Sequence, residues 1–304
     1  MNRESHHHHH HAPANYNRAF AVGVTLNVIF VGIEFTYGVI ADSLALITDA
    51  GYNLSDVLGL LLAWGASYLA TKQPSIRRTY GYSRATILAS MFSGLLLLAA
   101  VVVITWEAVH RFFEPAQPAG QVIMVVAAIG VVINSVTAWF FVAGKDHDLN
   151  IRGAYLHMAA DALVSVGVVI AGYVIWQFGW DWFDPFISLL IAVVILASTW
   201  GLLRDSLNLA IDGVPRGVDP EKVRDWITEQ PGVEGIHDLH IWPLSTTDTA
   251  LTAHLLMPVP PQDDAFLHDL AVQLHERFEI SHATFQVERG DLDEPCIQSQ
   301  TCAD

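Results

Sequence analysis

Charged side chains are scarce in this chain. Lys, Arg, Asp and Glu make up 15% of its 304 residues, whereas an ordinary soluble domain carries about 25%. Apolar residues make up 52% of the sequence, and the mean hydropathy is +0.38. This balance argues against a wholly soluble protein and indicates a chain that is largely embedded in a membrane.

Basic residues are especially rare toward the end of the chain. From Asp205 onward there are 19 Asp and Glu against 5 Lys and Arg. A nucleic-acid partner needs a basic face, so none is expected. An acidic segment of this kind is compatible with the attraction of cations.

Cysteine is nearly absent. Cys296 and Cys302 lie within the last ten residues, which argues against a secreted disulfide scaffold. They are either free thiols in a reducing compartment or a metal-binding pair. No cleavable signal peptide is recognised, and the run His6–His11 is either a purification tag or a native metal-binding tract.

Long apolar runs dominate the first two thirds of the sequence. A bilayer is spanned by about 20 mostly apolar residues, and six stretches qualify, at 18–40, 44–70, 84–108, 120–144, 155–178 and 182–203. The sequence therefore predicts an N-terminal tail over 1–15 and an all-α transmembrane domain of six helices over 16–204.

Successive connections between these runs lie on opposite sides of the membrane, and the basic residues near the runs are concentrated on one side. One side carries Arg18, Lys72, Arg77, Arg78, Arg84, Lys145, Arg152 and Arg204. The other side carries only Arg111. Because cytoplasmic loops hold the excess of Lys and Arg, we expect a multi-pass protein of the inner (cytoplasmic) membrane with both termini in the cytoplasm.

Residues 205–290 have the pattern of a small soluble domain. Helical spacing over 218–233 and 263–279 alternates with strand-like alternation over 235–245, 249–259 and 282–289. The order helix–strand–strand–helix–strand predicts a small α+β sandwich. A tail over 291–304 holds the two cysteines.

A few polar residues interrupt the apolar runs. The ionisable ones are Glu34, Asp49, Asp56, His157 and Asp161, and Asn27, Asn53 and Asn134 are neutral. A charged group at membrane depth costs a few kcal/mol on insertion scales, so such groups usually face one another, a cavity or an ion.

Two pairs of these residues have helical spacing. Tyr52 and Asp56 are four residues apart, as are His157 and Asp161, so each pair lies on one helix face. If the two helices pack together, four side chains converge in the tetrahedral geometry that Zn²⁺ prefers. Asp49 lies about 10 Å from Asp56 along the helix, and we interpret it as a helix-end or exit-side charge.

A plainer interpretation is that His157 is only hydrogen-bonded to a neighbour and that the carboxylates pair with Arg204 or Lys145. A His/Asp metal site must lose protons to bind a divalent ion. On the metal interpretation, the site would therefore couple metal export to proton import.

Several stretches resemble the cation diffusion facilitator family, in particular its zinc-transporter-like (cobalt–zinc–cadmium efflux) branch. They are "ADSLALITDAGYNLSDVLGLLLAWGA", "RTYGYSRATILASMFSGLLLL", "NIRGAYLHMAADALVSVGVVIAG", "IHDLHIWPLS" and "ATFQVE". The resemblance covers residues 16–290. It implies six transmembrane helices, a cytoplasmic ferredoxin-like or copper-chaperone-like α+β domain, a homodimer and Zn²⁺/H⁺ antiport.

The resemblance also implies a transport site. Asp56, His157 and Asp161 match its ligands, but Tyr52 stands where the family has His. A phenol is a poor neutral ligand. Tyr52 is then a native variant with altered selectivity, an engineered substitution that locks one state, or part of a site with three ligands and water.

Histidines recur in the predicted soluble domain. His237 and His254 lie on consecutive strands and Glu288 on the last, so a sheet could bring them together at one end. The resemblance implies that these three bind additional zinc, and that Cys296 and Cys302 match the cysteine pair in some members' tails.

Other histidines of this domain fit ordinary roles. His240 is three residues from His237, which on a regular strand places it on the opposite face. His268 and His275 fit an ordinary helix surface.

Three functions compete. The first is a secondary active exporter of Zn²⁺, with Cd²⁺ or Co²⁺ as further substrates, in exchange for protons. The second is a membrane-anchored metal sensor or buffer, and the third is a passive channel, disfavoured because no filter-like loop is recognised. An enzyme is not expected, because no nucleophile–base motif stands out.

Overall fold

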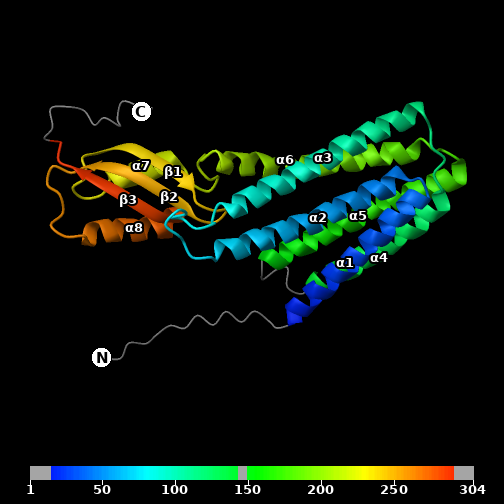
Figure 1. Ribbon diagram of the computed structural model, residues 1–304, viewed down its shortest axis with the longest axis horizontal. Helices are drawn as coiled ribbons and strands as arrows, with labels where there is room; N and C mark the ends of the chain where they lie inside the picture. Colours follow the sequence, from blue (N-terminus) through cyan, green and yellow to red (C-terminus); the bar gives the residue numbers. More distant parts are fainter. Residues whose placement is uncertain (1–14, 143–148, 291–304) are drawn as a thin grey trace. The chain divides into compact units, whose positions relative to one another are not determined.

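The computed structural model describes residues 15–142 and 149–290 (Figure 1). The His6–His11 run, Cys296 and Cys302 lie outside the described residues, so the predictions about them stay predictions. The chain divides into two compact units. One contains the residues up to Val57 together with Leu97–Ala197, and the other contains Leu58–Leu96 together with the residues from Ser198 onward.

In the described residues, six long helices account for the apolar part of the chain, and this confirms the prediction of an all-α domain. They are α1 (Asn15–Ile40), α2 (Leu44–Ala70), α3 (Ala85–Phe113), α4 (Gly120–Val142), α5 (Leu149–Phe178) and α6 (Phe183–Ala210). Within the described ranges, four spans are long and apolar enough to cross a membrane by themselves: Ala85–Phe113, Gly120–Phe140, Tyr155–Phe178 and Phe183–Ala210. The apolar stretch found in α1 is shorter, Thr25–Ile40, and α2 is interrupted by the polar residues discussed below.

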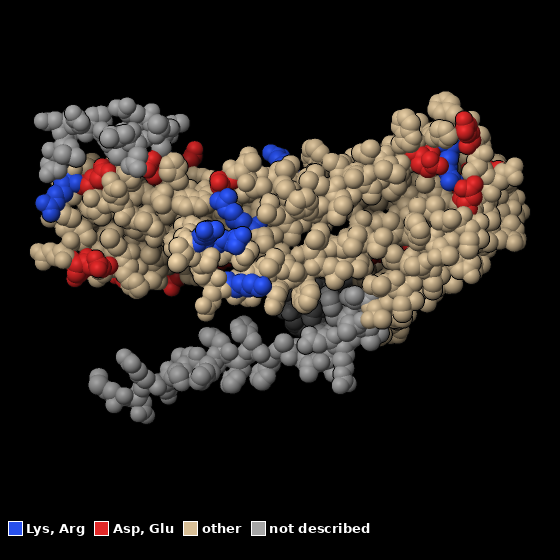
Figure 2. Space-filling view, viewed as in Figure 1, with Lys and Arg blue, Asp and Glu red and all other residues tan. Residues whose placement is uncertain are grey.

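The outer surface of these helices is apolar. Trp64, Trp106, Trp139 and Leu163 are each more than 70% exposed, which a soluble protein avoids over large areas. In Figure 2 the helices show a broad face almost free of Lys, Arg, Asp and Glu. This surface suits contact with lipid.

Helices α4 and α5 pack backbone to backbone. A Cβ atom added at Gly120 would lie 2.6 Å from the backbone nitrogen of Trp176, and one at Gly172 would lie 2.6 Å from that of Met124. Gly120 of α4 contacts Trp176 of α5, and Met124, further along α4, contacts Gly172, which is earlier on α5. The two helices are therefore antiparallel. Small residues permit this close approach within a membrane, and it fixes the height of α5 against α4.

The start of α2 is held by a carboxylate from another helix. Asp184, at the start of α6 and 1% exposed, accepts hydrogen bonds from Ser43 Oγ at 2.6 Å and from the backbone nitrogens of Leu44 and Ala45 at 2.7 and 3.2 Å. It thereby satisfies free N–H groups at the positive end of α2. Arg111 Nη1 lies 3.9 Å from Asp184. These contacts set the depth of the polar residues that α2 carries.

The second unit contains the predicted α+β fold. Its elements are α7 (Pro220–Thr228), β1 (Gly235–Pro243), β2 (Thr249–Leu256), α8 (Ala265–Phe278) and β3 (Ile280–Glu288). The sheet order is β1-β2-β3, with β1 antiparallel and β3 parallel to the central β2 (Figure 1). The predicted order of elements is confirmed.

The central strand β2 separates the domain core from the opposite face of the sheet. Leu251 and Leu255 point to one side of β2, and they share an apolar core with Ile227 of α7 and Leu274 of α8. Side chains alternate along a strand, so His254 lies on the opposite face. The face away from the helices is therefore free to carry polar ligands.

Replacing Gly172 with Ala is expected to destabilise the membrane helices. The added methyl would meet the backbone of α4, and overpacking of this kind typically costs about 1–3 kcal/mol. Gly167→Ala on the same helix is the matched control, because an added Cβ there meets nothing within 4 Å. Thermal unfolding of the purified full chain in detergent should show a lower midpoint for Gly172→Ala only; equal midpoints would contradict the close packing.

Candidate metal sites

Helices α2 and α5 bring three of the predicted ligands together. His157 Nε2 lies 3.4 Å from Asp56 Oδ2 and 3.6 Å from Asp161 Oδ2. The imidazole thus sits between a carboxylate of α2 and one of its own helix. Helices α2 and α5 meet here, as predicted. His157 is the shared partner of both carboxylates.

The three side chains of this group differ in how far they are exposed. The side chain of His157 is 40% exposed, that of Asp56 24% and that of Asp161 2%. One O atom on each carboxylate, Asp56 Oδ2 and Asp161 Oδ1, is buried without a well-formed hydrogen bond in the described part of the chain. Oxygen atoms in this condition can accept a cation or a proton.

Tyr52 stands beside the imidazole. Its ring centre lies 6.5 Å from that of His157, at an angle of 63°. The ring also packs against the apolar core of the helices. Tyr52 therefore borders the group of Asp56, His157 and Asp161, and its phenol adds only a weak neutral ligand.

Asp49 is not a helix-end charge, which was one of the two interpretations predicted for it; the other, an exit-side charge, stays a prediction. It is fully buried, and it accepts a hydrogen bond from Ser165 Oγ at 3.1 Å. Glu34 of α1, also fully buried, interacts with the Asp49 side chain. Sequence reasoning noticed both residues but gave them no shared position, because only the packing of α1 against α2 brings them together.

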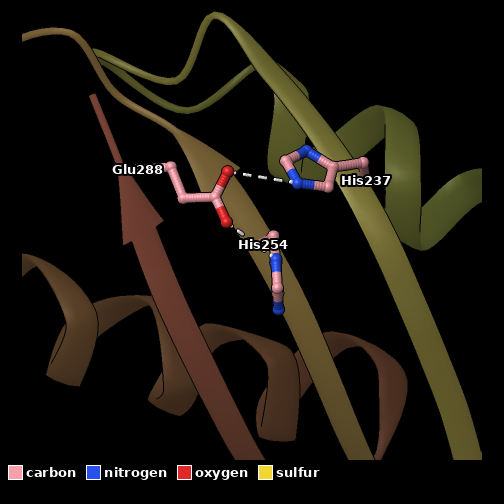
Figure 3. Close-up of side chains that lie close together, drawn as sticks. All are labelled: His237, His254 and Glu288. Atoms are coloured by element: carbon pink, nitrogen blue, oxygen red, sulfur yellow. Dashed lines mark ion pairs between the residues drawn. The ribbon is translucent and has the colours of Figure 1, made fainter. Parts of the chain in front are cut away.

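The sheet carries a tighter group. Within residues 15–142 and 149–290, one set of three possible ligands has its atoms all within 4.8 Å of one another: His237, His254 and Glu288. Glu288 Oε1 lies 2.9 Å from His254 Nδ1, and Glu288 Oε2 lies 3.2 Å from His237 Nε2 (Figure 3). Two imidazoles and a carboxylate are ligands that suit Zn²⁺.

Strand register explains this convergence. His237 of β1 lies directly opposite His254 of β2, and His254 lies opposite Gln286 of β3. Glu288 is two residues beyond Gln286, so it is on the same face and reaches back to both imidazoles. His268 and His275 belong to α8 and do not take part in this group.

Asp238 is a residue whose role sequence reasoning missed. The pairing of β1 with β2 is irregular between His237 and His240, and Asp238 has a positive φ of 51° there. Its carboxylate lies 3.4 Å from His254 Nε2 and 3.0 Å from His240 Nε2. A carboxylate on one ring nitrogen orients a histidine and leaves the other nitrogen, here Nδ1, for a metal.

Comparisons with known proteins agree with these features. Residues 20–209 match the family profile described as the cation efflux transmembrane domain, and residues 215–290 match that of the cation efflux protein cytoplasmic domain. The chain is 37% identical over 289 residues to the cation efflux system protein CzcD of Alcaligenes sp. (strain CT14), covering 94% of this chain and 90% of that one.

Two further relatives are similar over most of their length. The cadmium, cobalt and zinc/H(+)-K(+) antiporter of Bacillus subtilis (strain 168) is 36% identical over 261 residues, covering 84% of each chain. The zinc transporter ZitB of Escherichia coli (strain K12) is 36% identical over 272 residues, covering 88% of this chain and 86% of that one.

Replacing Tyr52 with His is expected to raise the affinity for Zn²⁺. A neutral imidazole nitrogen would join His157 and the two carboxylates, whereas the phenol contributes little. Tyr52→Phe is the matched control, because it keeps the ring and removes only the hydroxyl. Isothermal titration of the purified variants would measure the change; an unchanged affinity in Tyr52→His would show that position 52 is not a ligand position.

Proposed function

This chain belongs to the cation diffusion facilitator family of cation efflux proteins, and on that premise we propose that it is a secondary active exporter of divalent metal cations. Zn²⁺ is the main substrate in this proposal, with Cd²⁺ and Co²⁺ as further substrates, and protons move in exchange. The observation that carries it is the imidazole of His157 placed between Asp56 and Asp161 within apolar helices.

The same three side chains can hold either a metal ion or protons. Binding of a divalent cation to imidazole and carboxylate requires that these groups lose their protons. When the site opens to the other side, proton return favours release of the metal. Exchange then follows from competition for the same lone pairs, provided that the site faces one side of the membrane at a time.

The distribution of charge supports a location in the inner membrane with both termini in the cytoplasm. Lys72, Arg77, Arg78 and Arg84 lie between α2 and α3, as expected for a cytoplasmic connection. Arg111, at the opposite ends of the helices, is paired with Asp42 and Glu107. Its charge is therefore largely balanced.

In the same proposal, the sheet holds a resident Zn²⁺ that regulates transport. His237, His254 and Glu288 supply three ligands, and a Cys of the tail, Cys296 or Cys302, could supply a fourth. The donor set and the spacing of its atoms fit this ion. A zinc bound in the sheet would favour the homodimer that the resemblance implies.

A second candidate function is a membrane-anchored metal sensor or buffer. It is favoured by one observation: the possible ligand atoms of His237, His254 and Glu288 in the sheet lie closer together than those of Asp56, His157 and Asp161 among the helices. In that case the helices would serve as an anchor. Transport measurements separate the two functions.

Purified protein in liposomes is expected to carry Zn²⁺ in a saturable way that depends on the pH gradient. Uptake of Zn²⁺ should rise when the lumen is made acidic and fall when the gradient is removed. Asp161→Asn should abolish transport, because it removes a buried carboxylate from the site. A sensor would move no Zn²⁺ under any gradient, and a channel would respond to voltage rather than to pH.

His254→Ala is expected to remove zinc from the sheet and to weaken the dimer, while the membrane site still binds Zn²⁺. The loss of one of three ligands typically lowers metal affinity strongly. His268→Ala, on the surface of α8, is the control. Bound zinc and dimer mass would be measured by metal analysis and analytical ultracentrifugation; loss of binding at the membrane site as well would contradict this division of roles.

A further inference from the structure

The connection between α2 and α3 is basic in a chain that is otherwise acidic. The whole chain has 31 acidic and 15 basic residues. Residues 57–106 contain no Asp or Glu, but they contain Lys72, Arg77, Arg78 and Arg84. Figure 2 shows blue side chains gathered where the cyan connection runs in Figure 1. The positive charge is therefore a local property of this connection.

Three of these four cations lack a carboxylate partner among the described residues. Arg84 is paired with Asp212 at 2.6 Å. No ion pair within the described part of the chain includes Lys72, Arg77 or Arg78. All three residues are exposed. Their charges are therefore available to an anion that the described residues do not supply.

The backbone of the connection gathers the three residues into one short loop. Ser75 and Arg78 exchange two backbone hydrogen bonds of 3.0 Å, which leaves residues 76–77 at the tip of a tight turn. The Gly81 N–H donates to the Arg78 carbonyl at 2.9 Å. A Cβ atom added at Gly81 would lie 3.2 Å from the Lys72 carbonyl oxygen. The chain thus folds back from Arg78 onto Lys72, with the tip between them.

Aromatic rings hold two of the cations without neutralising them. Lys72 Nζ lies 5.5 Å from the centre of the Tyr68 ring. Arg78 Cζ lies 4.8 Å from the centre of the Tyr82 ring, and Arg78 Nη1 donates a hydrogen bond of 2.9 Å to the Tyr82 hydroxyl. A ring face attracts a cation but carries no net charge. Both cations are therefore positioned in advance, which lowers the cost of ordering them when an anion binds.

The end of α2 places this loop at the level of lipid headgroups. Leu60, Trp64, Tyr68 and Lys72 are spaced by four residues, so they follow one face of the helix and its last turn. Leu60 is 54% exposed, Trp64 72% and Tyr68 61%. Trp and Tyr are typical of the boundary between the acyl chains and the headgroups of a bilayer. A phospholipid whose chains lie along Leu60 and Trp64 would carry its phosphate beside Lys72.

We propose that Lys72, Arg77 and Arg78 bind the phosphate headgroup of an anionic phospholipid whose acyl chains lie against Leu60 and Trp64. Lys and Arg bind phosphate through charge-assisted hydrogen bonds. Each Lys or Arg close to an anionic membrane surface strengthens the attraction about fivefold. The lipid site shares no residue with the proposed transport site.

The test measures lipid binding to the purified full chain in detergent, by native mass spectrometry in the absence of metal. Dioleoyl phosphatidylglycerol is the anionic probe, and dioleoyl phosphatidylethanolamine, which has no net charge, is the reference. The parent should bind its first phosphatidylglycerol more tightly than phosphatidylethanolamine. Lys72→Gln, Arg77→Gln and Arg78→Gln should each weaken that binding about fivefold and leave phosphatidylethanolamine unaffected. Lys72→Arg keeps the charge and should bind as the parent does.

Control variants locate the bound lipid. Lys222→Gln removes one Lys charge from the surface of α7, and it should bind phosphatidylglycerol as the parent does. Brominated phosphatidylglycerol should quench part of the tryptophan fluorescence, and that part should fall in Trp64→Phe. Asp161→Asn should bind the lipid normally, so failure of the proposed transport function would leave the lipid site standing.

Four results would overturn the lipid site. Equal affinity of the parent for the two lipids would show that the three cations are not free for a headgroup, as when the acidic segment 291–304 occupies them. Unchanged binding in all three Gln variants would place the lipid elsewhere. An equal loss in Lys222→Gln would reduce the effect to net charge. Competition by inorganic phosphate at the concentration of the lipid would make this a site for free phosphate. An unchanged melting temperature shows that each variant is folded.

Discussion

An imidazole between two carboxylates inside an apolar helix bundle is the constraint on which the rest of this structure depends. Such groups are tolerated at membrane depth only if they are held against one another or against an ion. Asp184 holds the start of α2, and the glycine face of α4 holds α5. These two attachments, made far from His157 in sequence, keep Asp56 within reach of the imidazole.

The two candidate metal groups differ in how tightly they are built, and the difference fits the roles proposed for them. In the sheet, where backbone hydrogen bonds join three strands, Glu288 lies 2.9 Å from His254 and 3.2 Å from His237. Among the helices, His157 lies 3.4 and 3.6 Å from carboxylates on its two sides. A transport site must bind well enough to load and loosely enough to release, whereas a regulatory site gains from being preformed.

Much of this arrangement was predictable because it follows from local periodicity. Apolar runs predicted the six helices, and alternation predicted the three strands. The spacing of His157 and Asp161 predicted that they share a helix face. The position of Asp49 was not predictable in this way. Its burial beside Glu34 and Ser165 requires three helices to pack at one depth, and no repeat within α2 contains that information. Asp238 was missed for a similar reason, since a local irregularity in strand β1 turns its carboxylate toward His254.

The sequence by itself determined the elements of this protein, their order, the membrane character of the helices and the kinds of ligand available. These properties depend on hydrophobicity and on spacing within single segments, which each segment carries alone. Only the tertiary structure decided which candidate ligands meet: that His157 faces Asp56 across two helices, and that Glu288 reaches back to His237 and His254. It also decided that Glu34 and Asp49 are buried side by side. Contacts of this kind depend on helix packing and strand register, which arise only when distant segments bury their surfaces against one another.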